Sequence, residues 1–202
     1  MGSLMGNPCK NLETHIADIE WQDQNSLILE IGSDRDEGST QLLGAIAKKV
    51  NAKFITVDVV DTASKRIKDD NIEFVVCDKG SSWCANKLAT TNYNIKILFL
   101  DNFDWIWGPV SKKRDYIEQQ IKEYAQRGVD MNNVDCVQEH LAQFMYCLPK
   151  LHKGSLVVCD DTWLNSDHNV YIGKCGPIVH YALFLGWQIV EEENGGVIIK
   201  NV

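Results

Sequence analysis

The sequence lacks several features that define other classes of protein. No stretch approaches the roughly 18 apolar residues of a membrane-spanning helix, and no signal-peptide pattern is present. The seven cysteines include no Cys-x-x-Cys pair, which favours reduced thiols over a zinc site or a disulfide framework. Basic residues are not in surplus either: the net charge is −8, which argues against a nucleic-acid substrate. We therefore expect a cytoplasmic protein with neither a membrane nor a nucleic-acid partner.

The chain also has no internal repeats, low-complexity segments or linkers. Its 202 residues, 45% of them hydrophobic, predict one globular domain over residues 1–202. Residues 1–25 are expected to contain an N-terminal helix at Asn11 to Trp21. Residues 108–149 are expected to hold an insertion of two helices, near 112–126 and from Asn132 or Asn133 to 148. This insertion is a candidate lid or homodimer surface, although ordinary packing accounts for it equally well.

The most informative stretch runs from Ser26 to Val60. The apolar run Leu27–Ile31 is typical of a strand buried on both faces, and it leads into a polar loop that begins at Gly32. A helix starts at Ser39 or Thr40, and a second buried strand ends on Asp58. The pattern predicts a βαβ unit with a glycine turn after its first strand and an acid at the tip of its second. Such a unit binds the nucleoside end of a cofactor.

The loop itself favours one cofactor over another. It lacks the Gly-x-Gly-x-x-Gly pattern that brings a pyrophosphate against bare backbone, so an NAD-type oxidoreductase is the weaker interpretation. Asp34, Asp36 and Glu37 would repel a pyrophosphate. They suit S-adenosylmethionine, which carries a sulfonium and an ammonium, and whose carboxylate could lie at the helix N-terminus.

The remainder of the chain alternates strand and helix patterns. Further strands are predicted at residues 72–77, 95–100 and 155–159. A helix at 177–186 is followed by two strands at 187–190 and 197–200, and Asn194-Gly195 between them is a strong hairpin signal. The order predicts an α/β, Rossmann-like fold. We expect a mostly parallel, seven-stranded sheet that ends in an antiparallel hairpin, with helices on both faces.

These residues resemble the class I S-adenosylmethionine-dependent methyltransferases. The segment from Glu30-Ile31-Gly32 to Gly38-Ser39-Thr40 is similar to their first motif, and Asp58 to their ribose-binding acid. The resemblance implies that Gly32 lines the methionine moiety and that Asp78 or Lys79 lies near the adenine, although Asp78 is also suited to cap a helix. The cofactor-binding residues expected from motif and position are Glu30, Gly32, Ser33, Asp34, Gly38, Ser39, Thr40, Asp58, Val59, Asp78, Lys79 and Asp101.

Carboxylates follow the fourth and fifth predicted strands. Asp101, Asp160 and Asp161 would meet at one edge of a parallel sheet, where they could hold Mg²⁺ that lowers the pKa of a substrate hydroxyl. The alternative is that they cap turns and contact backbone. The arrangement resembles metal-dependent O-methyltransferases of the catechol type, except that Asp161 stands where asparagine is usual. Asp160-Asp161-Thr162 also resembles cephalosporin-hydroxylase-like relatives.

Histidines and tryptophans near the same strand ends complete the candidate site. His168, in the polar loop after the fifth strand, is a candidate general base by its location, and a solvent-exposed loop histidine is the alternative. His140 lies beside an apolar helical stripe and is expected to be a packed, hydrogen-bonded histidine. Trp105, Trp107 and Trp163 would form an aromatic wall for a planar or apolar substrate, although core packing explains them equally well.

Together these patterns predict an S-adenosylmethionine-dependent methyltransferase that acts on a small molecule. The acceptor atom is expected to be oxygen, with Asp101 and His168 as catalytic residues and assistance from Mg²⁺. Three alternatives stay open. The protein binds S-adenosylmethionine without catalysis, it runs a different reaction at the same site, or it is an oxidoreductase. The residues that would select the acceptor lie where no motif applies.

Overall fold

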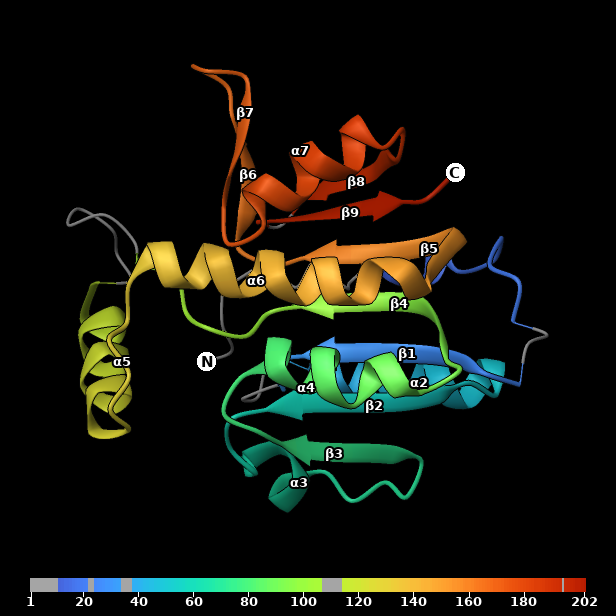
Figure 1. Ribbon diagram of the computed structural model, residues 1–202, viewed down its shortest axis with the longest axis horizontal. Helices are drawn as coiled ribbons and strands as arrows, with labels where there is room; N and C mark the ends of the chain where they lie inside the picture. Colours follow the sequence, from blue (N-terminus) through green and yellow to red (C-terminus); the bar gives the residue numbers. More distant parts are fainter. Residues whose placement is uncertain (1–10, 22–23, 34–37, 107–113, 194) are drawn as a thin grey trace.

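A seven-stranded sheet forms the centre of the chain (Figure 1). The structure is a computed structural model that describes residues 11–21, 24–33, 38–106, 114–193 and 195–202. Its strand order is β3-β2-β1-β4-β5-β9-β8, with β1 to β5 parallel and β9 antiparallel to both β5 and β8. The predicted sheet and its terminal hairpin are confirmed. The strands are β1 (Ser26–Ile31), β2 (Lys53–Asp58), β3 (Ile72–Val76), β4 (Asn94–Leu100), β5 (Leu151–Cys159), β8 (Gln188–Glu193) and β9 (Gly196–Lys200).

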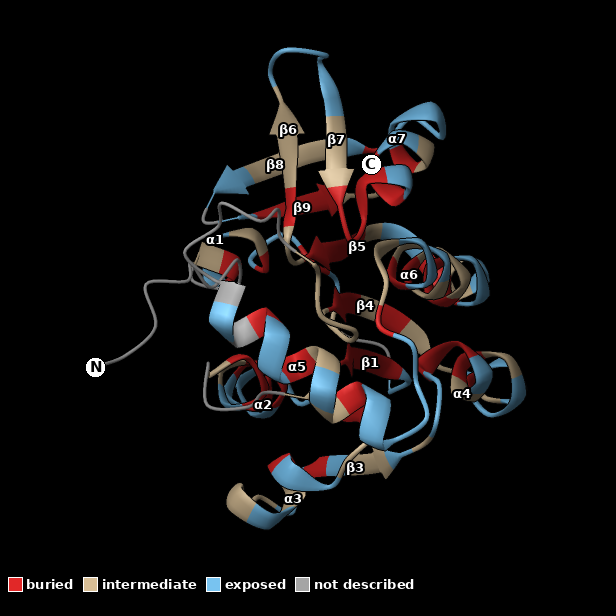
Figure 2. Cartoon of the chain, turned by 90° about the vertical axis from the view of Figure 1, so that its left-hand side faces the viewer, coloured by how far each residue is buried: buried red, intermediate tan, exposed pale blue. Residues whose placement is uncertain are grey.

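Every residue of β1 is buried, because helices cover both faces of the sheet. Leu27, Leu29 and Ile31 pack into the core on the face of α4, α6 and α7, whereas Ile28 packs with α1 and α2 on the other face. The alternation is the two-residue period of a strand, and it turns Glu30 toward α2. Figure 2 shows these layers nearly end-on. The helices are α1 (Leu12–His15), α2 (Ser39–Val50), α3 (Thr62–Arg66), α4 (Gly80–Asn86), α5 (Arg114–Gln126), α6 (Asn133–Cys147) and α7 (Gly176–Phe184), with short 3-10 turns at Leu88–Thr90 and Leu148–Lys150.

The N-terminal helix is shorter than its pattern predicts. A helix was expected over Asn11 to Trp21, but α1 ends after one turn. The carbonyl of Ile16 accepts hydrogen bonds from the backbone of Ile19 at 3.1 Å and from the indole of Trp21 at 3.3 Å. Because these bonds draw the chain into a turn at Ile16, the apolar residues beyond it pack on the sheet without continuing the helix.

Two elements lie at the edge where the parallel strands end. The two views agree that α5 crosses in front of the carboxyl ends of the strands (Figures 1 and 2). A separate two-stranded ribbon, β6 (Thr162–Asn165) with β7 (Val170–Gly173), rises from the end of β5 and stands clear of the sheet (Figure 1). The sequence pattern indicated only a polar loop there, because the ribbon's inward and outward residues do not alternate cleanly.

The order of the strands marks where a ligand would bind. The chain proceeds from β1 outward to β2 and β3, and then crosses back to β4 on the other side of β1. Open α/β sheets bind ligands at such a reversal, outside the carboxyl ends of the strands. The residues that follow β1 and β4 are therefore candidates for a ligand-binding site.

Two further observations concern the expected absence of membrane spans and of disulfides. Within the described residues, no helix is long and apolar enough to cross a membrane. The six cysteines in that part of the chain form no disulfide. A cytoplasmic location and a homodimer stay predictions.

Candidate functional site

Glu30 anchors the loop that follows β1. Its carboxylate is fully buried and accepts hydrogen bonds from the hydroxyls of Ser39 at 2.9 Å, Thr40 at 2.7 Å and Thr56 at 2.6 Å. Burial raises the pKa of Glu30 to about 8, although the three hydroxyl donors oppose this shift. Glu30 thus ties β1 to the start of α2 and to β2 from inside the fold, and it positions the loop without itself facing solvent.

Gly32 brings the end of β1 against the end of β4. Its φ is +101°, in the region that favours glycine, and a Cβ atom there would overlap the backbone of Asp101 and Asn102. The backbone N–H of Asp101 donates to the carbonyl of Ile31 at 2.8 Å across the same gap. The predicted methionine-lining residue and the predicted catalytic residue are therefore adjacent at the strand reversal.

Asp58 ends β2 beside this loop. Its carboxylate accepts a hydrogen bond from the backbone N–H of Ser33 at 2.7 Å and another from Val60 at 3.1 Å. The hydroxyl of Ser33 also meets that of Thr56 at 2.8 Å, so the loop and β2 are joined twice. These contacts orient the carboxylate at the end of β2, where the sequence predicts a ribose-binding acid.

The remaining predicted cofactor residues are less defined. Gly38 precedes α2 as its N-cap, and Asp34 lies outside the described residues, as do Asp36 and Glu37. Val59, Asp78 and Lys79 are exposed beyond the ends of β2 and β3. Their contacts with a cofactor stay predictions.

A carboxylate of α6 reaches the start of α4 near Asp78 and Lys79. Glu139 accepts from the backbone N–H of Ser81 at 2.8 Å and from its hydroxyl at 2.7 Å. Gln143, also from α6, donates to Glu139 at 2.9 Å and to Asn102 at 2.8 Å. A polar chain therefore links the region of the predicted adenine contact to the residue that follows Asp101.

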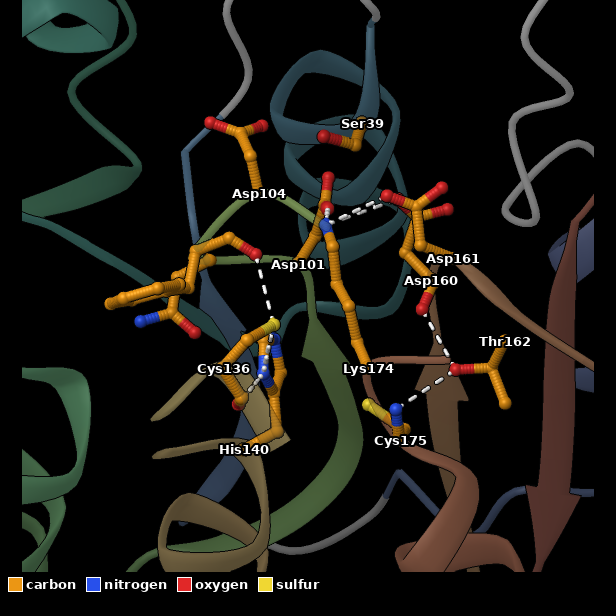
Figure 3. A network of polar contacts seen from close by, with 12 residues as sticks. Ser39, Asp101, Asp104, Cys136, His140, Asp160, Asp161, Thr162, Lys174 and Cys175 are labelled. Atoms are coloured by element: carbon orange, nitrogen blue, oxygen red, sulfur yellow. Dashed lines mark hydrogen bonds and ion pairs between the residues drawn. The ribbon is translucent and has the colours of Figure 1, made fainter. Parts of the chain in front are cut away.

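The three carboxylates after β4 and β5 converge as predicted, but they converge on a lysine (Figure 3). The ammonium of Lys174 lies 2.7 Å from Asp101 Oδ1, 3.2 Å from Asp161 Oδ2 and 3.8 Å from Asp160 Oδ2. The lysine side chain is only 2% exposed. Burial alone lowers the pKa of Lys174, but attraction to the carboxylates of Asp101, Asp161 and Asp160 raises it well above the usual value, so the amine is charged.

The surroundings of Asp160 explain why the lysine is needed. Burial, and then the neighbouring charge of Asp101, raise the pKa of Asp160 well above its usual range. Lys174 opposes this shift. Without a cation, the three carboxylates could not all be ionised at this separation.

These residues do not fit the predicted magnesium site as they stand. The point at which the carboxylates converge is held by the Lys174 ammonium, and a dication bound there would have to share it with a buried positive charge. In the described part of the chain, no group of three or more His, Cys, Asp or Glu side chains is arranged to hold a metal ion. The assignment of Asp101, Asp160 and Asp161 as metal ligands stays a prediction, and the position of Lys174 counts against it.

His168 is not brought to the carboxylates. It is exposed in the turn between β6 and β7, and the four residues of β6 span roughly 13 Å at about 3.3 Å per residue. Its assignment as general base stays a prediction, with little geometric support. His140, by contrast, is fully buried below the site, and its Nδ1 bonds to the carbonyl of Cys136 at 2.7 Å (Figure 3). Burial lowers the pKa of His140 to about 4, which agrees with a packed, neutral histidine.

Two of the predicted tryptophans pack against each other. Trp105 and Trp163 pack edge to face, with ring centroids 6.2 Å apart and planes at 87°. Trp163 follows Thr162 at the base of the ribbon, and Trp105 lies four residues after Asp101 in the sequence. Both side chains are partly exposed, so they can form part of a substrate wall. Trp107 lies outside the described residues.

Sequence reasoning missed Lys174 entirely. The residue follows β7, so only the folded ribbon returns it to the strand ends. The available signal was indirect: a lone lysine follows the apolar residues Tyr171 and Ile172, in a chain whose strand ends are acidic.

Comparison with known proteins supports the fold. No protein-family model matches the sequence, and no curated protein matches it. A solved structure of MycE, a methyltransferase of the mycinamycin biosynthetic pathway in complex with Mg and SAH, superposes with a TM-score of 0.53 at 12% identity, covering 94% of this chain and 48% of that one. CalS11, a TDP-rhamnose 3'-O-methyltransferase of calicheamicin biosynthesis, gives 0.53 at 12% identity, covering 95% and 76%. The chain thus spans about half the length of MycE.

The fold is that of the Rossmann-like S-adenosylmethionine-dependent methyltransferases. Sheet order, terminal hairpin and covering helices agree with these structures over nearly the whole chain. The finer resemblance to the catechol-type and cephalosporin-hydroxylase-like groups stays a prediction.

Proposed function

We propose that this protein transfers a methyl group from S-adenosylmethionine to a hydroxyl group of a small molecule. The observation that carries the proposal is Asp58, whose carboxylate is oriented by the Ser33 backbone at the tip of β2. A carboxylate in this position accepts hydrogen bonds from ribose hydroxyls. The fold shared with MycE, solved with SAH, and with CalS11 supports the same cofactor.

The residues present fit such a cofactor. Gly32 permits backbone approach at the strand reversal, next to Asp101, and this would receive the methionine end. Asp58 would hold the ribose, and the exposed Asp78 and Lys79 are the proposed adenine contacts. No Gly-x-Gly-x-x-Gly loop is present to receive a pyrophosphate, which disfavours a dinucleotide.

The cofactor supplies a methyl group on a sulfonium and leaves as the neutral sulfide when an acceptor oxygen takes that methyl. The acceptor hydroxyl must then lose its proton. We assign the proton to Asp101, because it ends β4 beside Gly32, where the methyl donor would lie. Lys174, 2.7 Å from Asp101 Oδ1, fixes the orientation of that carboxylate.

The acceptor is proposed to be planar or apolar around its hydroxyl. Trp105 and Trp163, from the segments that follow β4 and β5, form an edge-to-face pair, and aromatic walls of this kind suit ring-containing ligands. The two small-molecule pathways named for MycE and CalS11 are consistent with an acceptor of this size.

Calorimetric titration with S-adenosylhomocysteine, beside NAD, tests the proposal. Micromolar binding of the first and none of the second is expected. Asp58→Ala should weaken binding by at least about tenfold, since a charge-assisted hydrogen bond is worth about 1.5–3 kcal/mol. The matched control is Asp61→Ala, which removes an exposed carboxylate three residues away that pairs with Lys65 on α3.

Other outcomes separate the alternatives. NAD binding without S-adenosylhomocysteine binding would establish the oxidoreductase interpretation and refute the cofactor assignment. Binding of S-adenosylhomocysteine, with no methyl transfer to a broad panel of hydroxylated acceptors, would leave a binding protein or a different reaction at this site.

A further inference from the structure

The cationic centre of the site is part of the chain itself. Lys174 Nζ is the point on which Asp101, Asp160 and Asp161 converge, at 2.7, 3.8 and 3.2 Å (Figure 3). In a metal-dependent hydroxyl methyltransferase this is the point at which three oxygen ligands would meet a divalent cation. Here an ammonium already neutralises part of their charge.

The backbone holds Lys174 at that point. Its N–H donates to the carbonyl of Asp161 at 3.0 Å, and the next N–H, of Cys175, donates to the hydroxyl of Thr162 at 3.0 Å. Gly173, with φ of +97°, allows this approach, because a Cβ atom there would overlap the Asp161 carbonyl. The lysine backbone is therefore fastened to the segment that carries two of the three carboxylates.

Moving the Lys174 side chain out of the cluster would be costly. It is 2% exposed, and a buried ammonium moved away from its carboxylates would lose its compensating charges. A dication entering the same cluster would meet that ammonium at close range. Space and charge both oppose a metal while Lys174 is present.

We propose that Lys174 is a built-in cation that takes the place of a divalent metal in this site. Lys174 is then a positioning residue, which holds Asp101 and Asp161 in the geometry that a metal would otherwise impose. The assignment rests on the proposed function for its role in methyl transfer, whereas the exclusion of metal is a property of the cluster alone.

The substitution changes the chemistry available to the acceptor. A divalent metal acidifies a bound hydroxyl by direct coordination, but an ammonium offers only N–H donors and a single charge. The three carboxylates with one ammonium keep a formal charge of −2 if all are ionised. The acceptor hydroxyl would therefore lose its proton to a carboxylate as the oxygen–methyl bond forms and the carbon–sulfur bond breaks, its electron pair remaining on sulfur.

Titration with Mn²⁺ in the presence of saturating S-adenosylhomocysteine tests the proposal without any acceptor. Wild-type protein should show no binding at up to millimolar Mn²⁺. Lys174→Ala removes the ammonium and opens space between the carboxylates, so it should gain Mn²⁺ binding by at least about tenfold. Lys174→Met, which removes the charge but fills the space, is the matched control and should not gain binding.

Two further variants provide a control and a fallback for the Mn²⁺ titration. Lys200→Ala removes a lysine that pairs with Asp18 at 3.4 Å on the far side of the sheet, and its titrations should match those of wild type. If Lys174→Ala does not fold, judged by circular dichroism, Lys174→Gln replaces it, because glutamine keeps a polar side chain that is shorter than lysine.

The results distinguish the exclusion of metal by the cluster from the proposed methyltransferase function. Mn²⁺ binding by the wild type would overturn it, as would a folded Lys174→Ala or Lys174→Gln protein that binds S-adenosylhomocysteine but no Mn²⁺. Failure of S-adenosylhomocysteine to bind any variant would count against the proposed function, while the Mn²⁺ titrations would still decide whether the cluster excludes a metal.

Discussion

Replacing Glu30 with glutamine should flatten the dependence of stability on pH. Glu30 is fully buried, and burial raises its pKa from 4.5 to about 8. In the folded protein the side chain therefore keeps its proton between these values, whereas in the unfolded chain it is ionised. Because the folded state binds more protons in this window, the contribution of Glu30 to stability is complete below pH 4.5 and is lost as pH rises through 8.

The size of the effect follows from the shift. A difference between 4.5 and about 8, at 1.36 kcal/mol per unit, corresponds to about 5 kcal/mol in total. Roughly 1.5–2 kcal/mol of this falls between pH 6.5 and 8. We choose this interval because His140, with a pKa of about 4 in the folded protein, stays neutral there and does not mask the titration of Glu30.

Urea unfolding at pH 6.5, 7.25 and 8 provides the measurement. The unfolding free energy of the wild type should fall by about 1.5–2 kcal/mol more than that of Glu30→Gln over this range. Glu20→Gln, at an exposed position, serves as the control and should follow the wild type. Parallel profiles for wild type and Glu30→Gln would refute the assignment of a buried carboxyl that titrates near neutrality.

Two other substitutions should change ligand affinity and the pH dependence of stability, respectively. Gly32→Ala should lower the affinity for S-adenosylhomocysteine by at least about a hundredfold in calorimetry, because the added Cβ atom would overlap the Asp101 backbone. The control is Gly186→Ala, which also lies at positive φ but has no such overlap, and it should bind normally. Burial lowers the pKa of His140 from 6.5 to about 4, so its contribution to stability is present above pH 6.5 and is lost as pH falls toward 4. Between pH 7 and 5 the wild type should therefore lose about 2 kcal/mol more than His140→Asn in urea unfolding, and equal losses would contradict that environment.

Local patterns were sufficient to predict the sheet. The apolar run of β1 is long enough to predict a strand from this segment alone, and Glu30, its fifth residue, could be placed just before the loop from the sequence. The convergence of Asp101 with Asp160 and Asp161 also followed from topology, because parallel strands end at one edge. The pattern could not predict where each side chain points, and the Glu30 carboxyl group turns inward to the hydroxyls of Ser39, Thr40 and Thr56.

The parts that could not be predicted depend on contacts that the apolar pattern of the sequence does not encode. Lys174 reaches the carboxylates because β6 and β7 pair, and that pairing has no turn signal as strong as the Asn194-Gly195 of the terminal hairpin. The length of the N-terminal helix was likewise decided by the indole of Trp21, which bonds back to Ile16. The first contact is a strand pairing and the second a local bond from a side chain, and neither follows from the spacing of apolar residues.

The two ends of the β6–β7 ribbon differ in how firmly they are held. Its base is fastened at both strands, since Lys174 bonds to Asp161 and Cys175 bonds to Thr162. Its turn, by contrast, is exposed and stands clear of the sheet (Figure 1). Insertions or replacements at the turn should therefore leave the charged cluster in place, so the far end of the ribbon can vary in sequence and length while Lys174 and its carboxylates keep their geometry.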